Sequence, residues 1–119
     1  MLKSHKDLEV WKVSVEFVTD LYRLTNSFPK SELFSLTNQI RRAAISIPSN
    51  IAEGAGRKNT KEFIQFLYIA LGSLSELETQ LLIAKNIDYL TDDQIDTDKI
   101  RSIRVLLSSL IRALTNKIT

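Results

Sequence analysis

The chain has 119 residues and a formal net charge of +2, from 16 Lys and Arg against 14 Asp and Glu, which is enough for one domain and too little for two. Its 44% hydrophobic and 25% charged residues exclude intrinsic disorder as the main state. The absence of cysteine excludes disulfides, thiolate metal sites and cysteine nucleophiles. We expect a single domain over residues 1–119, with no signal peptide and a cytoplasmic location. The most apolar stretch, residues 63–71, is far short of the ~20 residues that cross a bilayer.

The first expected helix covers residues 8–24, where apolar side chains recur at spacings of three and four. We assign its core stripe to Leu8, Trp11, Val15, Val18 and Tyr22. A second apolar set lies off this stripe and consists of Val10, Val13, Phe17, Leu21 and Leu24. A helix that is apolar on most sides is buried on most sides, yet a four-helix monomer buries only one face of each helix. The second set therefore predicts self-association.

The second expected helix begins between Ser31 and Ser35 and is stopped by Gly54 and Gly56. Its core stripe consists of Leu36, Ile40, Ala43 and Ile47. Pro48 lies inside this helix, cannot donate to the carbonyl of Ala44, and predicts a kink. The polar residues around the proline are expected to bond the freed carbonyls; they are Ser46, Ser49 and Asn50.

The third and fourth expected helices each follow a capping-box pattern, Asn59 with Glu62 and Thr91 with Gln94. The third seam consists of Phe63, Leu67, Ala70, Leu74, Leu77, Leu81 and Ala84, and the fourth of Ile100, Ile103, Leu107, Leu110 and Leu114. No strand-like alternation occurs, and the connections are short. We therefore predict an all-α fold, an antiparallel up-down-up-down four-helix bundle with helix two kinked at Pro48.

The residues needed for catalysis are scarce. The one histidine, His5, lies in the N-terminal tail, and neither Glu76 nor Glu78 has a histidine three residues on, as a di-metal bundle requires. The segment Gly54–Lys58 is glycine-containing but follows a helix rather than the strand of a phosphate-binding loop. We expect a non-enzymatic protein with no cofactor, no metal and no small-molecule substrate.

One segment is far more specific than a generic amphipathic helix. Residues 39–57 read QIRRAAISIPSNIAEGAGR, preceded by LEVW at 8–11 and followed by FLYIALGSL at 66–74. This pattern resembles the four-helix-bundle family encoded in intervening sequences of bacterial 23S ribosomal RNA genes. The resemblance implies a bundle, a ring-shaped homo-oligomer that is a pentamer in known relatives, and no known catalysis. The chain is also similar in fold to the accessory protein of diversity-generating retroelements, a basic pentamer that binds nucleic acid and a reverse transcriptase.

Two functional hypotheses follow from the charges, the apolar surplus and these resemblances. In the first, an oligomer binds RNA or DNA without base-specific readout, because residues 36–61 hold five basic side chains against Glu53. The candidate nucleic-acid-binding residues are Arg42, Arg57, Lys58 and Lys61, and the candidate oligomer-interface residues are Trp11, Arg41, Ile45 and Tyr68. An ordinary surface is the alternative for these charges, with Arg57 paired to Glu53. In the second hypothesis, a ring-shaped scaffold docks a partner protein, such as a reverse transcriptase, without touching nucleic acid.

Overall fold

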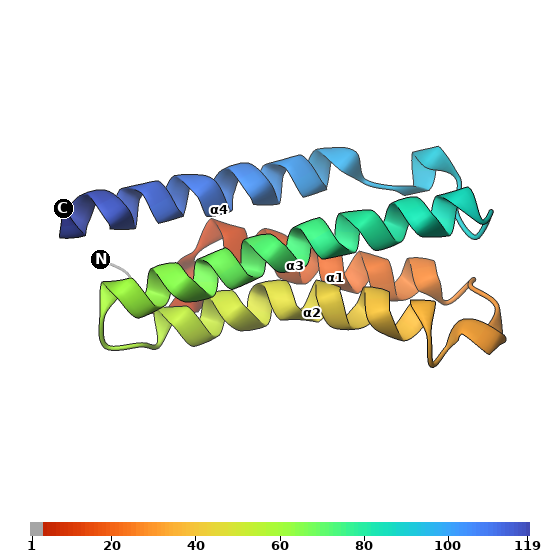
Figure 1. Ribbon diagram of the computed structural model, residues 1–119, viewed down its shortest axis with the longest axis horizontal. Helices are drawn as coiled ribbons and strands as arrows, with labels where there is room; N and C mark the ends of the chain where they lie inside the picture. The colour runs from red at the N-terminus through yellow and green to blue at the C-terminus, as the bar shows by residue number, and fades with distance from the viewer. Residues whose placement is uncertain (1–3) are drawn as a thin grey trace.

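Four long helices make up most of the computed structural model, which describes residues 4–119. They are α1 (Glu9–Thr25), α2 (Leu36–Ala55), α3 (Thr60–Asn86) and α4 (Thr97–Ile118), with the short 3₁₀ helices η1 (His5–Asp7), η2 (Lys30–Glu32) and η3 (Asp92–Gln94) between and before them. Residues 4–119 contain no strand, so the fold is an all-α four-helix bundle. In Figure 1, α1 and α3 run toward one end of the molecule and α2 and α4 run back. The bundle measures 47 × 22 × 19 Å.

The core lies where the predicted stripes of α2, α3 and α4 meet. In α2 the side chains of Ile40, Ala43 and Ile47 are buried, as the sequence predicted. The α3 seam is buried from Leu67 to Ala84, and the α4 seam is buried at Ile100, Ile103 and Leu107. The predicted seam members Phe63, Leu110 and Leu114 are only partly buried, and near the end of α4 the buried side chain is Ile111 instead. Each of these stripes repeats every three or four residues, so one side of each helix faces the other helices. Burial of these apolar surfaces is the main favourable contribution to folding.

The buried face of α1 differs from the prediction. The core receives Val10, Phe17 and Leu21, which the sequence placed off the core stripe, whereas Val15 is exposed and Trp11 is only half-buried. Both stripes have helical spacing, so periodicity alone does not choose between them. The buried face also carries polar residues, Ser14 and Thr25, whose hydroxyls donate to helix carbonyls one turn earlier, at 2.6 and 2.8 Å. Polar positions that satisfy themselves in this way are compatible with a core.

Helix α2 continues through Pro48 to Ala55. Beside the proline, the Asn50 side chain donates to the carbonyl and hydroxyl of Ser46, at 2.7 and 2.8 Å, and the Ser46 hydroxyl lies 2.8 Å from that of Ser73 on α3. The expected polar cluster is therefore present at Ser46 and Asn50, while Ser49 is exposed. Its acceptor is the Ser46 carbonyl rather than that of Ala44. The bend at Pro48 stays a prediction.

Helix ends follow capping rules, with one correction. Asn59 caps α3, since its side chain accepts from the N–H of Glu62 at 2.9 Å. The predicted box at Thr91 caps the short helix η3, and α4 starts later, where the Asp96 side chain accepts from the N–H of Lys99 at 3.0 Å. Asp88, after α3, has a φ of 68°. That left-handed conformation lets the next N–H, of residue 89, donate back to the carbonyl of residue 84 at 2.9 Å.

Helix α3 is long and apolar enough to cross a membrane by length and composition alone. Within the bundle, its seam packs against the other helices. The core helix of a soluble protein passes the same test, so a single helix of this kind is weak evidence for a membrane span.

Candidate nucleic-acid interface

The turn between α2 and α3 brings three of the predicted nucleic-acid-binding residues to one end of the bundle. Backbone N–H groups of Gly56 and Arg57 close the last turn of α2 by donating to carbonyls three and four residues earlier. Arg57 and Lys58 then lie in the turn itself, and Lys61 lies in the first turn of α3. All three residues are exposed. This short turn therefore concentrates positive charge at the end of the bundle.

The three cations differ in how far their charge is already compensated. The Arg57 guanidinium lies 3.7 Å from a carboxylate oxygen of Glu53, as the alternative interpretation of the sequence predicted. It also stacks over the Phe66 ring, with 4.8 Å from Cζ to the ring centroid. Lys58 and Lys61 form no ion pair with any residue between 4 and 119. The two lysines are consequently the more available partners for an anion.

Two other helices add basic residues to the same end. The start of α1 and the end of α4 lie beside the α2–α3 turn in Figure 1. They contribute Lys12, Arg112 and Lys117, and the short helix η1 just before α1 contributes Lys6. Sequence reasoning restricted to residues 36–61 missed these four, although the up-down order would have placed them there. We call the set Lys6, Lys12, Arg57, Lys58, Lys61, Arg112 and Lys117 the basic end.

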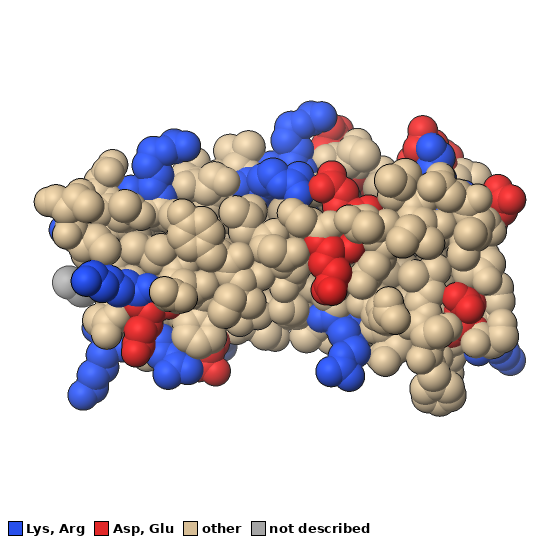
Figure 2. All heavy atoms as spheres, in the orientation of Figure 1, with Lys and Arg blue, Asp and Glu red and all other residues tan. Residues whose placement is uncertain are grey.

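The opposite end of the bundle has the opposite charge. Residues 85–98, which join α3 to α4, carry one lysine, Lys85, against five aspartates, Asp88, Asp92, Asp93, Asp96 and Asp98. In Figure 2 blue side chains predominate at the left end of the visible face and red ones at the right end. The basic end also holds four carboxylates, Asp7, Glu9, Glu53 and Glu62, so its seven cations leave a net charge of +3 (7 − 4), against −4 (1 − 5) for residues 85–98. The molecule is therefore polarised along its long axis although its net charge is only +2.

Arg42 does not belong to the basic end. It precedes Arg57 by fifteen residues of mostly helical chain, which corresponds to about 22 Å along the axis. Its side chain is exposed and lines a hollow of about 370 Å³ between α2 and α3, together with Glu76 and Gln80. The structure therefore separates one of the four predicted nucleic-acid contacts from the other three.

The predicted interface residues occupy two opposite sides of the bundle. Arg41 reaches from α2 to α1, where it donates to the Thr25 hydroxyl at 2.9 Å and lies 4.6 Å over the Tyr22 ring. Ile45 follows one helical turn later and is exposed, and Trp11 shares the Tyr22 stripe of α1. These residues mark the outer α1–α2 side. Tyr68, 57% exposed, instead lines a hollow between α3 and α4.

These two sides are opposite because each helix packs against two neighbours. The packed pairs are α1 with α2, α2 with α3, α3 with α4, and α4 with α1. A molecule with apolar surface on two opposite sides suits head-to-tail association of identical chains. Arg41 is tied to α1 by its own hydrogen bonds, so its first role is to hold α1 against α2.

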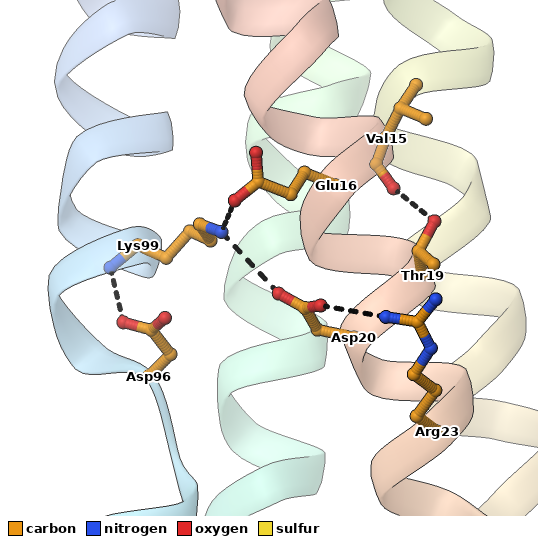
Figure 3. A network of polar contacts seen from close by, with 7 residues as sticks. All are labelled: Val15, Glu16, Thr19, Asp20, Arg23, Asp96 and Lys99. Atoms are coloured by element: carbon orange, nitrogen blue, oxygen red, sulfur yellow. Dashed lines mark hydrogen bonds and ion pairs between the residues drawn. The ribbon is translucent and has the colours of Figure 1, made fainter.

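Lys99 connects the aspartate-rich end formed by residues 85–98, called here the acidic end, to α1. Its amine donates to Glu16 and lies 3.5 Å from Asp20, both on α1, while Asp20 also pairs with Arg23 (Figure 3). The hydrogen bond to Glu16 outweighs the effect of burial and raises the pKa of Lys99 above its usual 10.5. The network fixes the start of α4 onto α1.

The side chains of residues 4–119 do not assemble a metal site. No cluster of three or more His, Asp or Glu side chains that could hold a metal occurs in this part of the chain. His5 packs edge-on against Trp11, with 5.1 Å between the ring centroids. The features that distinguish the surface are its charge and its exposed apolar side chains.

Comparisons with known proteins agree with this architecture. The family model described as 23S rRNA-intervening sequence protein matches residues 6–112. The chain belongs to this family. A crystal structure of a protein of unknown function from the S23 ribosomal protein family of Bacteroides thetaiotaomicron is also similar, with 30% identity, a TM-score of 0.74, and coverage of 86% of this chain and 97% of that one. No curated protein matches the chain.

The match to the 23S rRNA-intervening sequence family covers α1, α2 and α3 and most of α4. It includes the α2–α3 turn with Arg57, Lys58 and Lys61, and it ends inside α4 at Arg112. Lys117, a further member of the basic end, lies beyond the matched residues. The likeness to the retroelement accessory protein stays an expectation from the sequence.

Proposed function

We propose that this member of the 23S rRNA-intervening sequence family is a non-enzymatic cytoplasmic oligomer that binds RNA through its basic end. The observation that carries the proposal is the gathering of seven cations from four helices (η1, α1, α3 and α4) and one turn at a single end, opposite an end rich in aspartate. Lysine and arginine side chains neutralise phosphates and release counterions, and this release drives much of nucleic-acid binding.

The exposed apolar side chains support the oligomeric part of the proposal. Monomeric proteins rarely expose large contiguous apolar patches, whereas this bundle exposes such residues on both the α1–α2 side and the α3–α4 side. Head-to-tail pairing of these sides closes a ring and leaves the bundle ends free. The basic ends of all copies then lie on one rim, which multiplies the positive charge offered to a polyanion. From the resemblance we expect five copies.

The basic end offers phosphate contacts rather than base recognition. The ring of Phe66, on α3, is already covered by the Arg57 guanidinium. A stacking platform for unpaired bases needs exposed aromatic faces. The exposed aromatic side chain beside Arg112 is Tyr68, which lines the hollow between α3 and α4 and which we assign to the oligomer interface rather than to RNA. Binding is therefore expected to depend on salt and to vary little with RNA sequence. DNA of similar length is expected to bind by the same contacts.

A charge-matched pair of variants tests the proposal. The basic-end variant is Lys58→Gln/Lys61→Gln, and the control removes two cations elsewhere, Arg101→Gln/Arg104→Gln, on α4. Fluorescence anisotropy with labelled single-stranded RNA measures the dissociation constant between 50 and 300 mM salt, about the range in which phosphate contacts dominate. The basic-end variant should lose about 1.4 units of log–log salt slope, at ~0.7 per contact for two lysines. The control should keep the wild-type slope.

Two outcomes would contradict the proposal. Equal affinities for the two charge-matched variants, at unchanged oligomeric mass, would remove the basic end as the binding surface. Absence of binding by the wild type at 50 mM salt would leave the protein-docking scaffold as the remaining function. Arg42→Gln, measured in the same series, tests the separate position of that residue.

A further inference from the structure

Phe34 is the most exposed large apolar side chain among residues 4–119, at 89%. It lies between η2 and α2, next to Leu33, which is also exposed. Its ring makes no aromatic contact within this part of the chain. An aromatic side chain offers a large apolar surface, and leaving it in water forfeits the free energy of burying it. Such a side chain, held on a short connection, has the form of an interface anchor.

A hollow of matching character lies at the same end of the bundle, between α3 and the start of α4. It has a volume of about 400 Å³, larger than a phenylalanine side chain. Its apolar wall consists of Leu82, Ile95 and Ile100, and Leu82 is 52% exposed. Thr79 and the Lys85–Asp92 ion pair, with an N–O distance of 3.2 Å, form its rim. The hollow can receive an aromatic ring without displacing core side chains.

The anchor and the hollow are placed for contact between two copies rather than within one. In Figure 1 the segment before α2 lies below α2, and the α3–α4 connection lies above α3, both at the right end. They therefore share a level along the long axis but lie on opposite sides. When two copies stand side by side in the same direction, the anchor of one faces the hollow of the other. Each copy keeps one anchor and one hollow free for the next copy.

Charges around the two features are complementary. Lys30, four residues before Phe34, and Arg23, at the end of α1, are exposed cations on the anchor side, while the carboxylate of Glu32 accepts from the Ser35 hydroxyl at 3.2 Å. The rim of the hollow includes Asp92, whose side chain is 82% exposed, and Asp93 follows it directly. Lys30 and Asp93 have no ion-pair partner among residues 4–119. Opposite charges at the rim of an apolar contact fix its orientation.

We propose that Phe34 of one copy inserts into the hollow lined by Leu82, Ile95 and Ile100 of the next copy. This inference rests on the self-association in the proposed function and specifies the contact that produces it. The contact is heterologous, since a different surface of each copy takes part, and it leaves the basic end uncovered. RNA binding and assembly therefore use different surfaces.

The cysteine-free sequence allows a direct test by disulfide cross-linking. Phe34→Cys and Leu82→Cys are prepared as separate proteins, mixed, and oxidised, so that a bond between the two positions joins different copies. Non-reducing electrophoresis and peptide mass spectrometry then identify the linked residues. We expect a Phe34→Cys to Leu82→Cys dimer as the main product. Phe34→Cys mixed with Val105→Cys, an exposed α4 position that does not line the hollow, is the control and should link at least tenfold less.

A second measurement uses a variant that preserves the fold. Phe34→Ser removes an exposed side chain, so helicity by circular dichroism should match the wild type, while the mass by light scattering should fall toward that of one chain. Ile118→Ser, at an exposed position at the end of α4, should keep the wild-type mass.

The outcomes separate this inference from the proposed function. A wild-type protein that is monomeric at micromolar concentration overturns both this contact and the oligomer. An oligomeric wild type with no link to position 82, and with unchanged mass in Phe34→Ser, overturns the Phe34 contact alone. Efficient linking of Phe34→Cys to itself also overturns it, because the contact would then be symmetric.

Discussion

We predict that replacing Gly54 destabilises the bundle, because the position is tightly packed against α3 and not because it ends a helix. It is buried inside α2, where the end of that helix meets the start of α3. A Cβ atom at this position would lie 2.7 Å from Cβ of Phe66, 2.9 Å from Cδ1 of Phe63 and 3.2 Å from the Phe63 carbonyl oxygen. The Phe66 Cβ is attached directly to the α3 backbone, so relief requires movement of the two helices apart. Gly54→Ala should therefore destabilise the bundle and loosen the turn that carries Lys58.

The size of the effect follows from two opposing contributions. In a helix, alanine is more favourable than glycine by about 1 kcal/mol, and this difference in helix propensity would stabilise Gly54→Ala. Overpacking a tight contact costs typically 1–3 kcal/mol, and two contacts below 3.0 Å indicate the upper part of this range. The net expectation is a loss of about 1–2 kcal/mol. At Gly72, in the middle of α3, an added Cβ atom would have open space around it. Gly72→Ala should therefore raise the free energy of unfolding by about 0.5–1 kcal/mol.

Urea unfolding followed by circular dichroism measures both changes, at several protein concentrations because association raises apparent stability. The urea midpoint should fall for Gly54→Ala and rise for Gly72→Ala, with m-values unchanged. Equal midpoints for the two variants would refute the close-packing explanation, because helix propensity would then account for both positions. An RNA affinity of Gly54→Ala below that of the wild type would link this contact to the basic end.

Three further predictions concern stability. Lys99→Met should lower the free energy of unfolding by about 1 kcal/mol near pH 7. Because the pKa of Lys99 is raised in the folded protein, the greater stability of the wild type should persist below pH 10.5 and disappear as the pH rises through the folded pKa. Thermal unfolding at several pH values would measure this. Asn50→Leu should lower the free energy of unfolding, measured in urea, by about 1–3 kcal/mol. Ser49→Ala, at an exposed position, should lower it by less than about 0.5 kcal/mol. Equal effects of the two substitutions would argue against the polar cluster. Asp88→Gly should raise the thermal midpoint by relieving the positive φ, a gain of about 0.5–1 kcal/mol, and a decrease would contradict this reasoning.

The sequence determined the helices themselves and most of their inward faces. Sparse glycine and proline, the three-and-four spacing and the Asn59 cap are local signals, and local signals decide where a helix starts and which stripe is apolar. The central parts of the α2, α3 and α4 seams were predictable from their apolar spacing. The prediction failed toward the end of α4, where Ile111 is buried and the predicted Leu110 and Leu114 are only partly buried. The same holds for the ion pair between Glu53 and Arg57, which needs only one helical turn.

Other features could be seen only in the tertiary structure, because they depend on contacts between residues that are far apart in the chain. Helix α1 has two apolar stripes, and only packing against its neighbours selected the one containing Phe17. The separation of Arg42 from the basic end and the addition of Lys117 follow from which helix ends meet in space. The sequence indicates Gly54 as a helix stop, whereas in the structure a glycine is needed there because a Cβ atom would lie too close to Phe66. Such distances between helices are set by the packing of whole side-chain surfaces, which no local pattern encodes.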